Sequence, residues 1–186
     1  MPHPMKLTRD GSALVVVDVQ ERLFAAMDAE HREEVVKNLK VLATAARRLG
    51  LPILITEQYP KGLGHTLPEL KEVLGPAEPV EKVAFSCCDA EGFSARLRAT
   101  GRRQVILAGI EAHVCVLLTG LDLLADGYTV HVAADAVTSR TQGSWRMGVD
   151  QLRQAGAVIT TTESVLFQLL QKADTDDFRV LAQLIR

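Results

Sequence analysis

The chain has 186 residues, of which 47% are hydrophobic and 24% are charged, a composition typical of a globular protein that buries a substantial core. Its 21 basic and 23 acidic residues give a formal net charge of −2, so we expect no binding to nucleic acid or to an anionic membrane surface. Three cysteines without a C-x-x-C pair predict neither a disulfide framework nor a cysteine metal site.

We also expect neither a membrane-spanning segment nor a signal peptide in this sequence. No apolar run has the length of a membrane span, and residues 1–6 lack the apolar core of a signal peptide. We therefore expect a cytoplasmic protein. No repeat, low-complexity segment or linker divides the chain, which predicts one domain over residues 1–186.

The first third of the chain alternates between strands and a helix. Residues 12–18 form an apolar run that ends in an acid, as expected of a central strand in a parallel sheet. Residues 21–24 are interpreted as a loop or short turn. Residues 31–49 carry the apolar stripe of an amphipathic helix that ends at Gly50, and residues 51–56 form the next strand.

A long connection rich in proline and glycine follows at residues 57–79, with a short helix predicted inside it at 67–74. Beyond it, strands are predicted at 80–83, 104–108, 128–133 and 157–160, and helices at 93–99, 116–124, 145–154, 163–171 and 176–184. This alternation predicts a Rossmann-like three-layer α/β/α fold with a mostly parallel sheet of about six strands.

Polar residues gather where the predicted strands end: Asp18, Glu57, Lys82, residues 111–115 and Asp135. In such sheets ligands bind beyond the carboxyl ends of the strands. The strand assignment alone therefore predicts a site at this edge.

Cys115 lies where a strand passes into the first turn of a helix. Free backbone N–H groups and the helix dipole at this place would stabilise a thiolate, lower its pKa and hold an oxyanion. Asp18 would take the thiol proton, and Lys82, which interrupts an apolar segment, would support both charges. The alternatives are that Cys115 is an ordinary buried thiol and that Lys82 reaches solvent.

Three stretches resemble the isochorismatase-like cysteine hydrolases, in the same order and over nearly the whole chain. They are Leu-Val-Val-Val-Asp-Val-Gln at 14–20, Lys82 with Phe85-Ser86, and Gly-Ile-Glu-Ala-His-Val-Cys-Val at 109–116. The resemblance implies a catalytic triad of Asp18, Lys82 and Cys115.

The same resemblance implies a non-proline cis peptide between Ile110 and Glu111. The backbone N–H groups of Glu111 and Cys115 would then form an oxyanion hole. The resemblance also implies a homo-oligomer, a dimer or a tetramer, with residues 116–124 and the terminal helices as candidate surfaces.

Some residues differ from those of characterised family members, and these differences limit which activity we expect. Nicotinamidases carry a metal-binding Asp-x-His and a later His after the second strand, where this chain offers only Glu57 and His65, so we expect no metal and no cofactor. Isochorismatase itself cleaves a vinyl ether and needs no thiol, so Cys115 favours acyl chemistry. Residues 57–64 most resemble the isochorismatase-domain-containing subgroup, whose members mostly lack an assigned substrate.

Four residues are candidates for substrate binding. Gln20 and Phe24 lie just beyond Asp18, although Phe24 is equally expected in the core. Tyr59 would close the pocket, unless it belongs to an exposed loop. His113 precedes Cys115 by two residues, and a Cys–His dyad is disfavoured because residues two apart on a helix point to different sides.

Two further pairs have both a functional and a structural interpretation. Cys87 and Cys88 would enter the site or resolve an oxidised Cys115, or serve as small apolar residues. Asp135 and Ser139 resemble a loop near the site in the family, or cap the following helix.

The sequence as a whole predicts a metal-independent cysteine hydrolase that cleaves a C–N bond in a small amide or carbamoyl compound through a thioester. The alternatives are an isochorismatase-type hydrolase of another small metabolite and a non-catalytic redox or binding module on the same fold.

Overall fold

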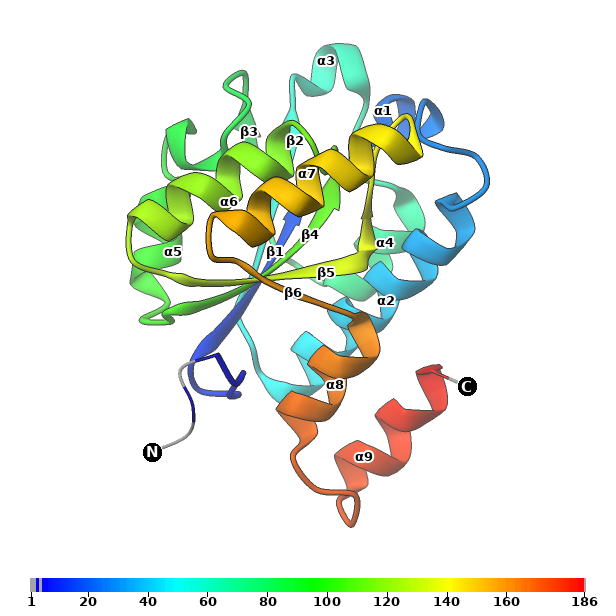
Figure 1. Cartoon of the computed structure of the whole chain (residues 1–186). Helices are drawn as coiled ribbons and strands as arrows, with labels where there is room; N and C mark the ends of the chain where they lie inside the picture. The colour runs from blue at the N-terminus through cyan, green and yellow to red at the C-terminus, as the bar shows by residue number, and fades with distance from the viewer. Residues whose placement is uncertain (1–2, 4, 186) are drawn as a thin grey trace.

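Six parallel strands form one central sheet in the computed structural model, which describes residue 3 and residues 5–185 (Figure 1). The strands are β1 Ser12–Val17, β2 Ile53–Gln58, β3 Val80–Lys82, β4 Gln104–Ile110, β5 Thr129–Thr138 and β6 Val158–Thr160. Their order across the sheet is β3-β2-β1-β4-β5-β6. The chain winds outward from β1 in one direction and from β4 in the other, so the carboxyl ends of these two strands form the switch point at which such folds bind ligands.

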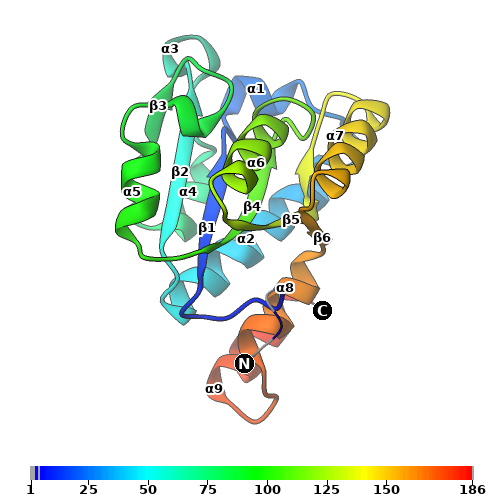
Figure 2. The ribbon, with the colours of Figure 1, turned by 60° about the vertical axis from the view of Figure 1, so that its left-hand side comes forward.

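Helices cover both faces of the sheet. They are α1 Glu21–Ala25, α2 Arg32–Leu49, α3 Pro60–Leu63, α4 Pro68–Leu74, α5 Phe93–Ala99, α6 Cys115–Ala125, α7 Gln142–Gln154, α8 Thr162–Leu170 and α9 Asp176–Leu181, with 3₁₀ turns at Cys87–Asp89 and Ala182–Ile185. Helices α5, α6 and α7 lie on one face, and α2, α4 and α8 on the other (Figure 2). The predicted three-layer α/β/α fold is confirmed.

Alternating side chains of the strands build two cores. In β1, Val15 and Val17 pack toward α5–α7, whereas Leu14 and Val16 pack toward α2, α4 and α8. All four are at most 1% exposed, and burying each side chain contributes about 1.5–3 kcal/mol. A strand used in this way must be apolar on both faces, which is why it appears in the sequence as a continuous run.

Several predicted boundaries were wrong. The expected turn at 21–24 is the helix α1, which is too short for its periodicity to be recognised. The connection 57–79 includes the end of β2, and α3 and α4 lie within it. Helix α7 begins at Gln142 because the hydroxyl of Thr141 accepts a hydrogen bond from the Ser144 backbone N–H at 3.1 Å.

The carboxyl ends of β1, β2 and β4 point toward the top of Figure 1, away from α8 and α9. Gly109, near the end of β4, has a φ of 116°, and a β-carbon there would overlap the carbonyl oxygen of Val17 in β1. A glycine is therefore needed for β4 to approach β1 beside Asp18.

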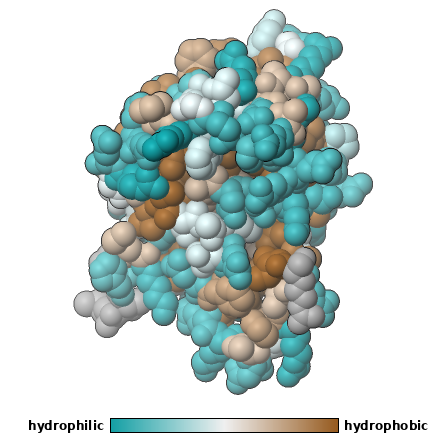
Figure 3. Space-filling view, turned by 45° about the vertical axis from the view of Figure 1, so that its right-hand side comes forward, coloured by the Kyte–Doolittle hydropathy of each residue, from teal (hydrophilic) through white to brown (hydrophobic). Residues whose placement is uncertain are grey.

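No helix in the described part of the chain is both long and apolar enough to cross a membrane. In Figure 3, hydrophilic side chains cover most of one face and hydrophobic ones show in patches between them.

His131 on β5 is a buried polar side chain outside the strand ends. It is fully buried, and neither ring nitrogen has a hydrogen-bond partner among the described residues. Burial lowers the pKa of His131 from 6.5 to about 4. The ring is therefore neutral at pH 7.

Between about pH 6.5 and about pH 4, the unfolded chain binds a proton at His131 readily, whereas the folded chain does not. We therefore expect His131 to lower the free energy of unfolding by about 3 kcal/mol as the pH falls through this range. Urea unfolding of His131→Leu between pH 7.5 and 4 should show a smaller loss than wild type. The exposed His3→Gln variant is the matched control. Parallel curves for wild type and His131→Leu would contradict the prediction.

Candidate active site

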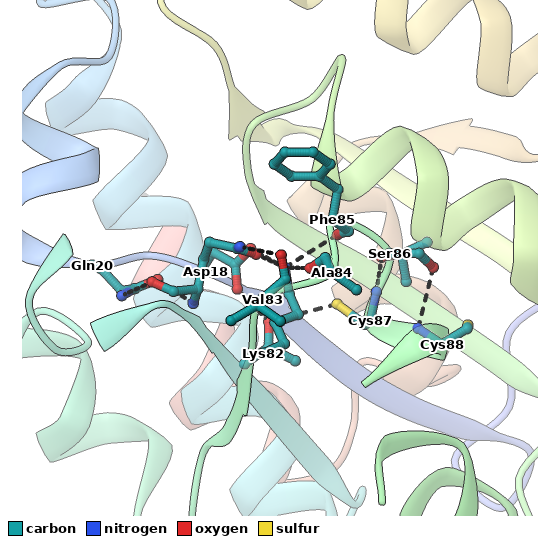
Figure 4. Close-up of polar contacts among 12 residues, drawn as sticks. Asp18, Gln20, Lys82, Val83, Ala84, Phe85, Ser86, Cys87 and Cys88 are labelled. Carbon is teal, nitrogen blue, oxygen red and sulfur yellow. Dashed lines mark hydrogen bonds and ion pairs between the residues drawn. The ribbon is translucent and has the colours of Figure 1, made fainter. Parts of the chain in front are cut away.

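Asp18 and Lys82 form a buried ion pair at the carboxyl ends of β1 and β3. Lys82 Nζ lies 2.7 Å from Asp18 Oδ2, and both side chains are 0% exposed. Figure 4 shows the pair beside the segment 83–88, with the Phe85 ring turned away from it. Of the two interpretations of Lys82, the structure supports pairing with an acid over extension into solvent.

The charge of Lys82 is maintained by its neighbours. Burial is the largest single effect and disfavours the ammonium, but the Asp18 carboxylate together with Cys87 and Cys115 outweighs it, so the pKa of Lys82 is raised. Lys82 is therefore a permanent cation at neutral pH.

Thr56 on β2 fixes Asp18 from its other side. Its hydroxyl donates to Asp18 Oδ1 at 2.7 Å, and its carbonyl accepts from the Asp18 backbone N–H at 3.1 Å. Asp18 itself has a φ of 51°, in the left-handed region. The carboxylate is therefore held at both oxygens, by Thr56 and by Lys82.

Cys115 is the first residue of α6 and is 5% exposed. The charges of Asp18 and Lys82 both act on its thiol, so the three predicted triad residues lie within electrostatic reach of one another. Burial and the Asp18 charge, only partly opposed by Lys82, raise the pKa of Cys115 to about 12. The expected lowering of this pKa was therefore wrong, because burial and a carboxylate stabilise the thiol.

The turn before Cys115 contains the cis peptide bond expected between Ile110 and Glu111. The Glu111 carbonyl accepts from the backbone N–H groups of Val114 and Val116 at 3.0 and 3.1 Å. Among the described residues, no backbone carbonyl accepts from the Cys115 N–H, as is usual for the first residue of a helix. This N–H is therefore available to a ligand.

Helix α7 and the segment after β5 fix the same turn. Arg140 donates through Nε and Nη2 to the two oxygens of the Glu111 carboxylate, both at 3.0 Å. A β-carbon at Gly148 in α7 would overlap the backbone at Ala112 and His113, so the helix packs directly on the turn. The turn is therefore supported from two sides.

The first two predicted substrate-binding residues are engaged within the protein. Gln20 is fully buried, and its amide donates to the carbonyls of Gln58 and Gly64 at 2.9 and 2.7 Å. Phe24 is 7% exposed and belongs to the core beneath α2. Both residues lie near Asp18 in the sequence, but in the structure their contacts stabilise the fold.

The other two occupy the rim of the strand ends. Tyr59 is 55% exposed and lines a cavity of about 470 Å³ together with Lys82. His113 Nδ1 lies 3.0 Å from the Ser139 hydroxyl, so His113 turns toward the end of β5. A substrate-binding role for Tyr59 and His113 remains a prediction.

Glu57 and His65 stand where a metal site was considered. His65 Nδ1 lies 2.9 Å from Glu57 Oε2, and Glu57 Oε1 accepts from both the N–H and the hydroxyl of Thr66 at 2.7 Å. Burial alone would raise the pKa of Glu57, but the hydrogen bonds from Thr66 and His65 lower it. Within the described residues there is no group of three potential metal ligands.

Of the residues with two interpretations, Cys87 lies beside the predicted triad and Asp135 lies at the start of α8. Cys87 is fully buried, and its sulfur lies 3.6 Å from the Thr56 hydroxyl that holds Asp18, so this thiol lies beside the triad. Asp135 accepts from the backbone N–H of Thr162 at 2.8 Å and from its hydroxyl at 3.0 Å. It therefore caps α8, although the sequence suggested capping of the next helix.

Thr56 and Gln58 contact the triad but were not predicted as site residues. Gln58 Oε1 lies 2.6 Å from Lys82 Nζ. Thr56 and Gln58 are two positions apart in β2, so their side chains lie on the same face of the strand, while that of Glu57 lies on the other face. Two polar residues with this spacing at the end of a buried strand are the signal that could have identified them.

Comparisons with known proteins agree with this geometry. The isochorismatase domain model matches residues 12–164. Isochorismatase domain-containing protein 2 of Danio rerio is 41% identical over 182 residues, which cover 97% of this chain and 89% of the relative.

Two solved structures resemble the chain closely. The MAR1 ribonuclease of Caenorhabditis elegans has a TM-score of 0.90 and 40% identity, covering 97% of this chain and 92% of that one. The YcaC gene product of Escherichia coli, described as an octameric hydrolase of unknown specificity, has a TM-score of 0.92 and 27% identity, covering 100% of this chain and 91% of that one. The chain therefore belongs to the isochorismatase family.

Proposed function

We propose that this protein is a cysteine hydrolase that cleaves the C–N bond of a small amide or carbamoyl compound, with Cys115, Asp18 and Lys82 as the catalytic triad. The observation that carries the proposal is the fully buried Asp18–Lys82 ion pair, whose two charges both act on the Cys115 thiol. A nucleophile, a base that contacts it and a cation that holds the base are the parts required for covalent acyl transfer.

Acylation begins when the Cys115 sulfur attacks the substrate carbonyl while its proton passes to Asp18. Because the pKa of Cys115 is raised to about 12, this proton leaves as the new bond forms rather than beforehand. The oxyanion accepts hydrogen bonds from the backbone N–H groups of Glu111 and Cys115. Asp18 then gives the proton to the leaving nitrogen, the C–N bond breaks, and a thioester remains.

Deacylation uses the same residues with water. Asp18 takes a proton from water, the hydroxide oxygen attacks the thioester carbonyl, and the sulfur leaves. The proton on Asp18 returns to the sulfur, which restores the thiol and releases a carboxylic or carbamic acid. Lys82 keeps its charge throughout and stabilises Asp18 whenever that residue is ionised.

A small substrate suits this site better than RNA. Asp18 and Lys82 are fully buried as side chains and Cys115 is 5% exposed, which leaves little exposed surface for a polymer at the reacting atoms. The chain has a net charge of −2 and 4% aromatic residues, so neither its overall charge nor its aromatic content favours RNA binding. Cleavage of RNA, the activity named for the C. elegans neighbour, is the second candidate.

We further propose that the protein is a homo-oligomer in a reducing, cytoplasmic compartment. The octameric E. coli neighbour supports self-association, as does the exposure of large apolar residues: Val83 at 80%, Phe85 at 58% and Leu118 at 39%. All three cysteines are free thiols. Light scattering after size exclusion should give a mass of at least two chains, and a monomer at micromolar concentration would contradict the proposal.

The catalytic proposal is tested by a panel of small amides and carbamoyl compounds assayed for ammonia or amine release, with an RNA substrate alongside. We expect Cys115→Ala to abolish hydrolysis and the half-buried Cys88→Ala to retain it, because Asp18 and Lys82 act on Cys115, whereas Asp122 and Asp126 act on Cys88. RNA cleavage that survives Cys115→Ala, with no amide hydrolysed, would favour the ribonuclease. A Cys115–Cys87 disulfide under mild peroxide, again without hydrolysis, would favour a redox module.

A further inference from the structure

Lys82 is surrounded by more hydrogen-bond acceptors than its ammonium has hydrogen atoms. Four oxygens lie around Nζ, belonging to Gln58 Oε1 at 2.6 Å, Asp18 Oδ2 at 2.7 Å, the Phe85 carbonyl at 3.1 Å and the Ala84 carbonyl at 3.2 Å. An ammonium has only three N–H bonds to donate. Its average position is therefore set by the balance among these four oxygens.

We infer that Gln58 is a positioning residue that fixes the Lys82 ammonium against Asp18 and Cys115, an inference that rests on the proposed function. Its oxygen makes the shortest contact to Nζ and comes from β2, whereas both carbonyls belong to the segment that follows Lys82 itself. Gln58 thus ties the lysine to the central sheet.

The Gln58 side chain is fixed at its other atom. Its Nε2 donates to the Val83 carbonyl at 2.8 Å, so the amide bridges Lys82 and the residue after it. An amide whose nitrogen is bound in this way has its oxygen directed at Nζ. The side chain has one orientation that satisfies both ends.

Gln20 holds the backbone of Gln58 in turn. The Gln58 backbone N–H donates to Gln20 Oε1 at 2.7 Å, and the Gln58 carbonyl accepts from Gln20 Nε2 at 2.9 Å. Gln20 is fully buried and follows Asp18 by two residues, and Figure 4 draws both side chains. The two hydrogen bonds between Gln20 and Gln58 therefore link the end of β2 to the segment that carries the base. These hydrogen bonds give Gln20 a structural role that does not depend on substrate binding.

Displacing the ammonium has a measurable consequence at Cys115. Lys82 is the charge that opposes the rise in the pKa of Cys115. Without Gln58, the Phe85 and Ala84 carbonyls would draw the ammonium toward their own segment. The Cys115 thiol would then ionise less readily, although Gln58 does not touch it.

The test is the pH profile of iodoacetamide alkylation at Cys115, read by peptide mass spectrometry from pH 7 to 10. We expect Gln58→Met, which has similar length and no strong acceptor, to slow alkylation about two- to tenfold at fixed pH, a shift of up to about one pKa unit. Glu57→Gln is the matched control, because it changes the adjacent residue on the opposite face of β2 and should leave the profile unchanged. Gln58→Asn, which is too short to reach Nζ, provides the same test if the methionine variant does not fold.

Lys82→Met in the same series separates the two proposals. A shift in Lys82→Met without one in either Gln58 variant overturns the positioning role and leaves the triad standing. A Gln58 shift no larger than that of Glu57→Gln also overturns it, because the effect is then a general disturbance of the strand. An unchanged profile in Lys82→Met removes the support for the proposed function itself.

Discussion

Replacing Lys82 with methionine is expected to lower the free energy of unfolding by about 3–5 kcal/mol, the cost of leaving one member of a buried ion pair alone. The Asp18 carboxylate would keep Thr56 as a hydrogen-bond donor but lose the cation paired with it. Urea unfolding followed by circular dichroism at pH 7 measures the change.

Two controls identify the cause of this loss. The double variant Asp18→Asn with Lys82→Met should recover part of the lost stability, because no charge is then buried without a partner. Lys40→Met removes a surface pair, Lys40–Glu69 at 3.4 Å with both side chains exposed, and should cost less than about 1 kcal/mol. A loss in Lys82→Met no larger than in Lys40→Met would show that the buried pair is not a fixed feature of the fold.

Asp18→Asn is expected to change thiol ionisation and turnover in opposite directions. Turnover should fall by about 10²–10⁴-fold because the general base is lost. The pKa of Cys115 should fall as well, since the charge of Asp18 raises it and the Lys82 cation remains. Iodoacetamide should then alkylate Cys115 faster at pH 8 than in wild type.

This combination is specific to a base that acts during bond formation. A variant that merely loosened the site would expose every thiol, so Cys88 serves as the internal reference in the same mass spectra. Burial, with the charges of Cys87 and Asp122, raises the pKa of Cys88 to about 12, and this thiol should stay slow. Full turnover in Asp18→Asn, or slower alkylation of Cys115, would exclude the assigned role.

The parts of the fold that the sequence predicts correctly are those with local physical signals. The central strands are apolar on both faces, and α2 shows a stripe of Val35, Leu39 and Leu42 before Gly50 ends it in the left-handed conformation. Helix α1, by contrast, has five residues and one buried side chain, Phe24, which is too little for a periodic signal.

The site divides in the same way. Asp18, Lys82 and Cys115 follow from their places at strand ends and from the resemblance to the family. The structure pairs Asp18 with Lys82, and both charges act on the Cys115 thiol. The pKa of Cys115 does not follow from sequence, because it depends on how deeply the thiol is buried and how close Asp18 lies. The proposed role of Gln58 also depends on a side-chain contact between β2 and β3 that joins residues 24 positions apart in the sequence.

The mass of the peptide containing Cys115, taken after acid quench during turnover of an amide that the protein hydrolyses, tests the role of Cys115 most directly. We expect an acyl group bound to Cys115 in wild type. We expect no such adduct in Cys115→Ala, which should be inactive. Hydrolysis that continues in Cys115→Ala, with no acyl adduct on the wild-type peptide, would contradict the proposal that Cys115 is the nucleophile.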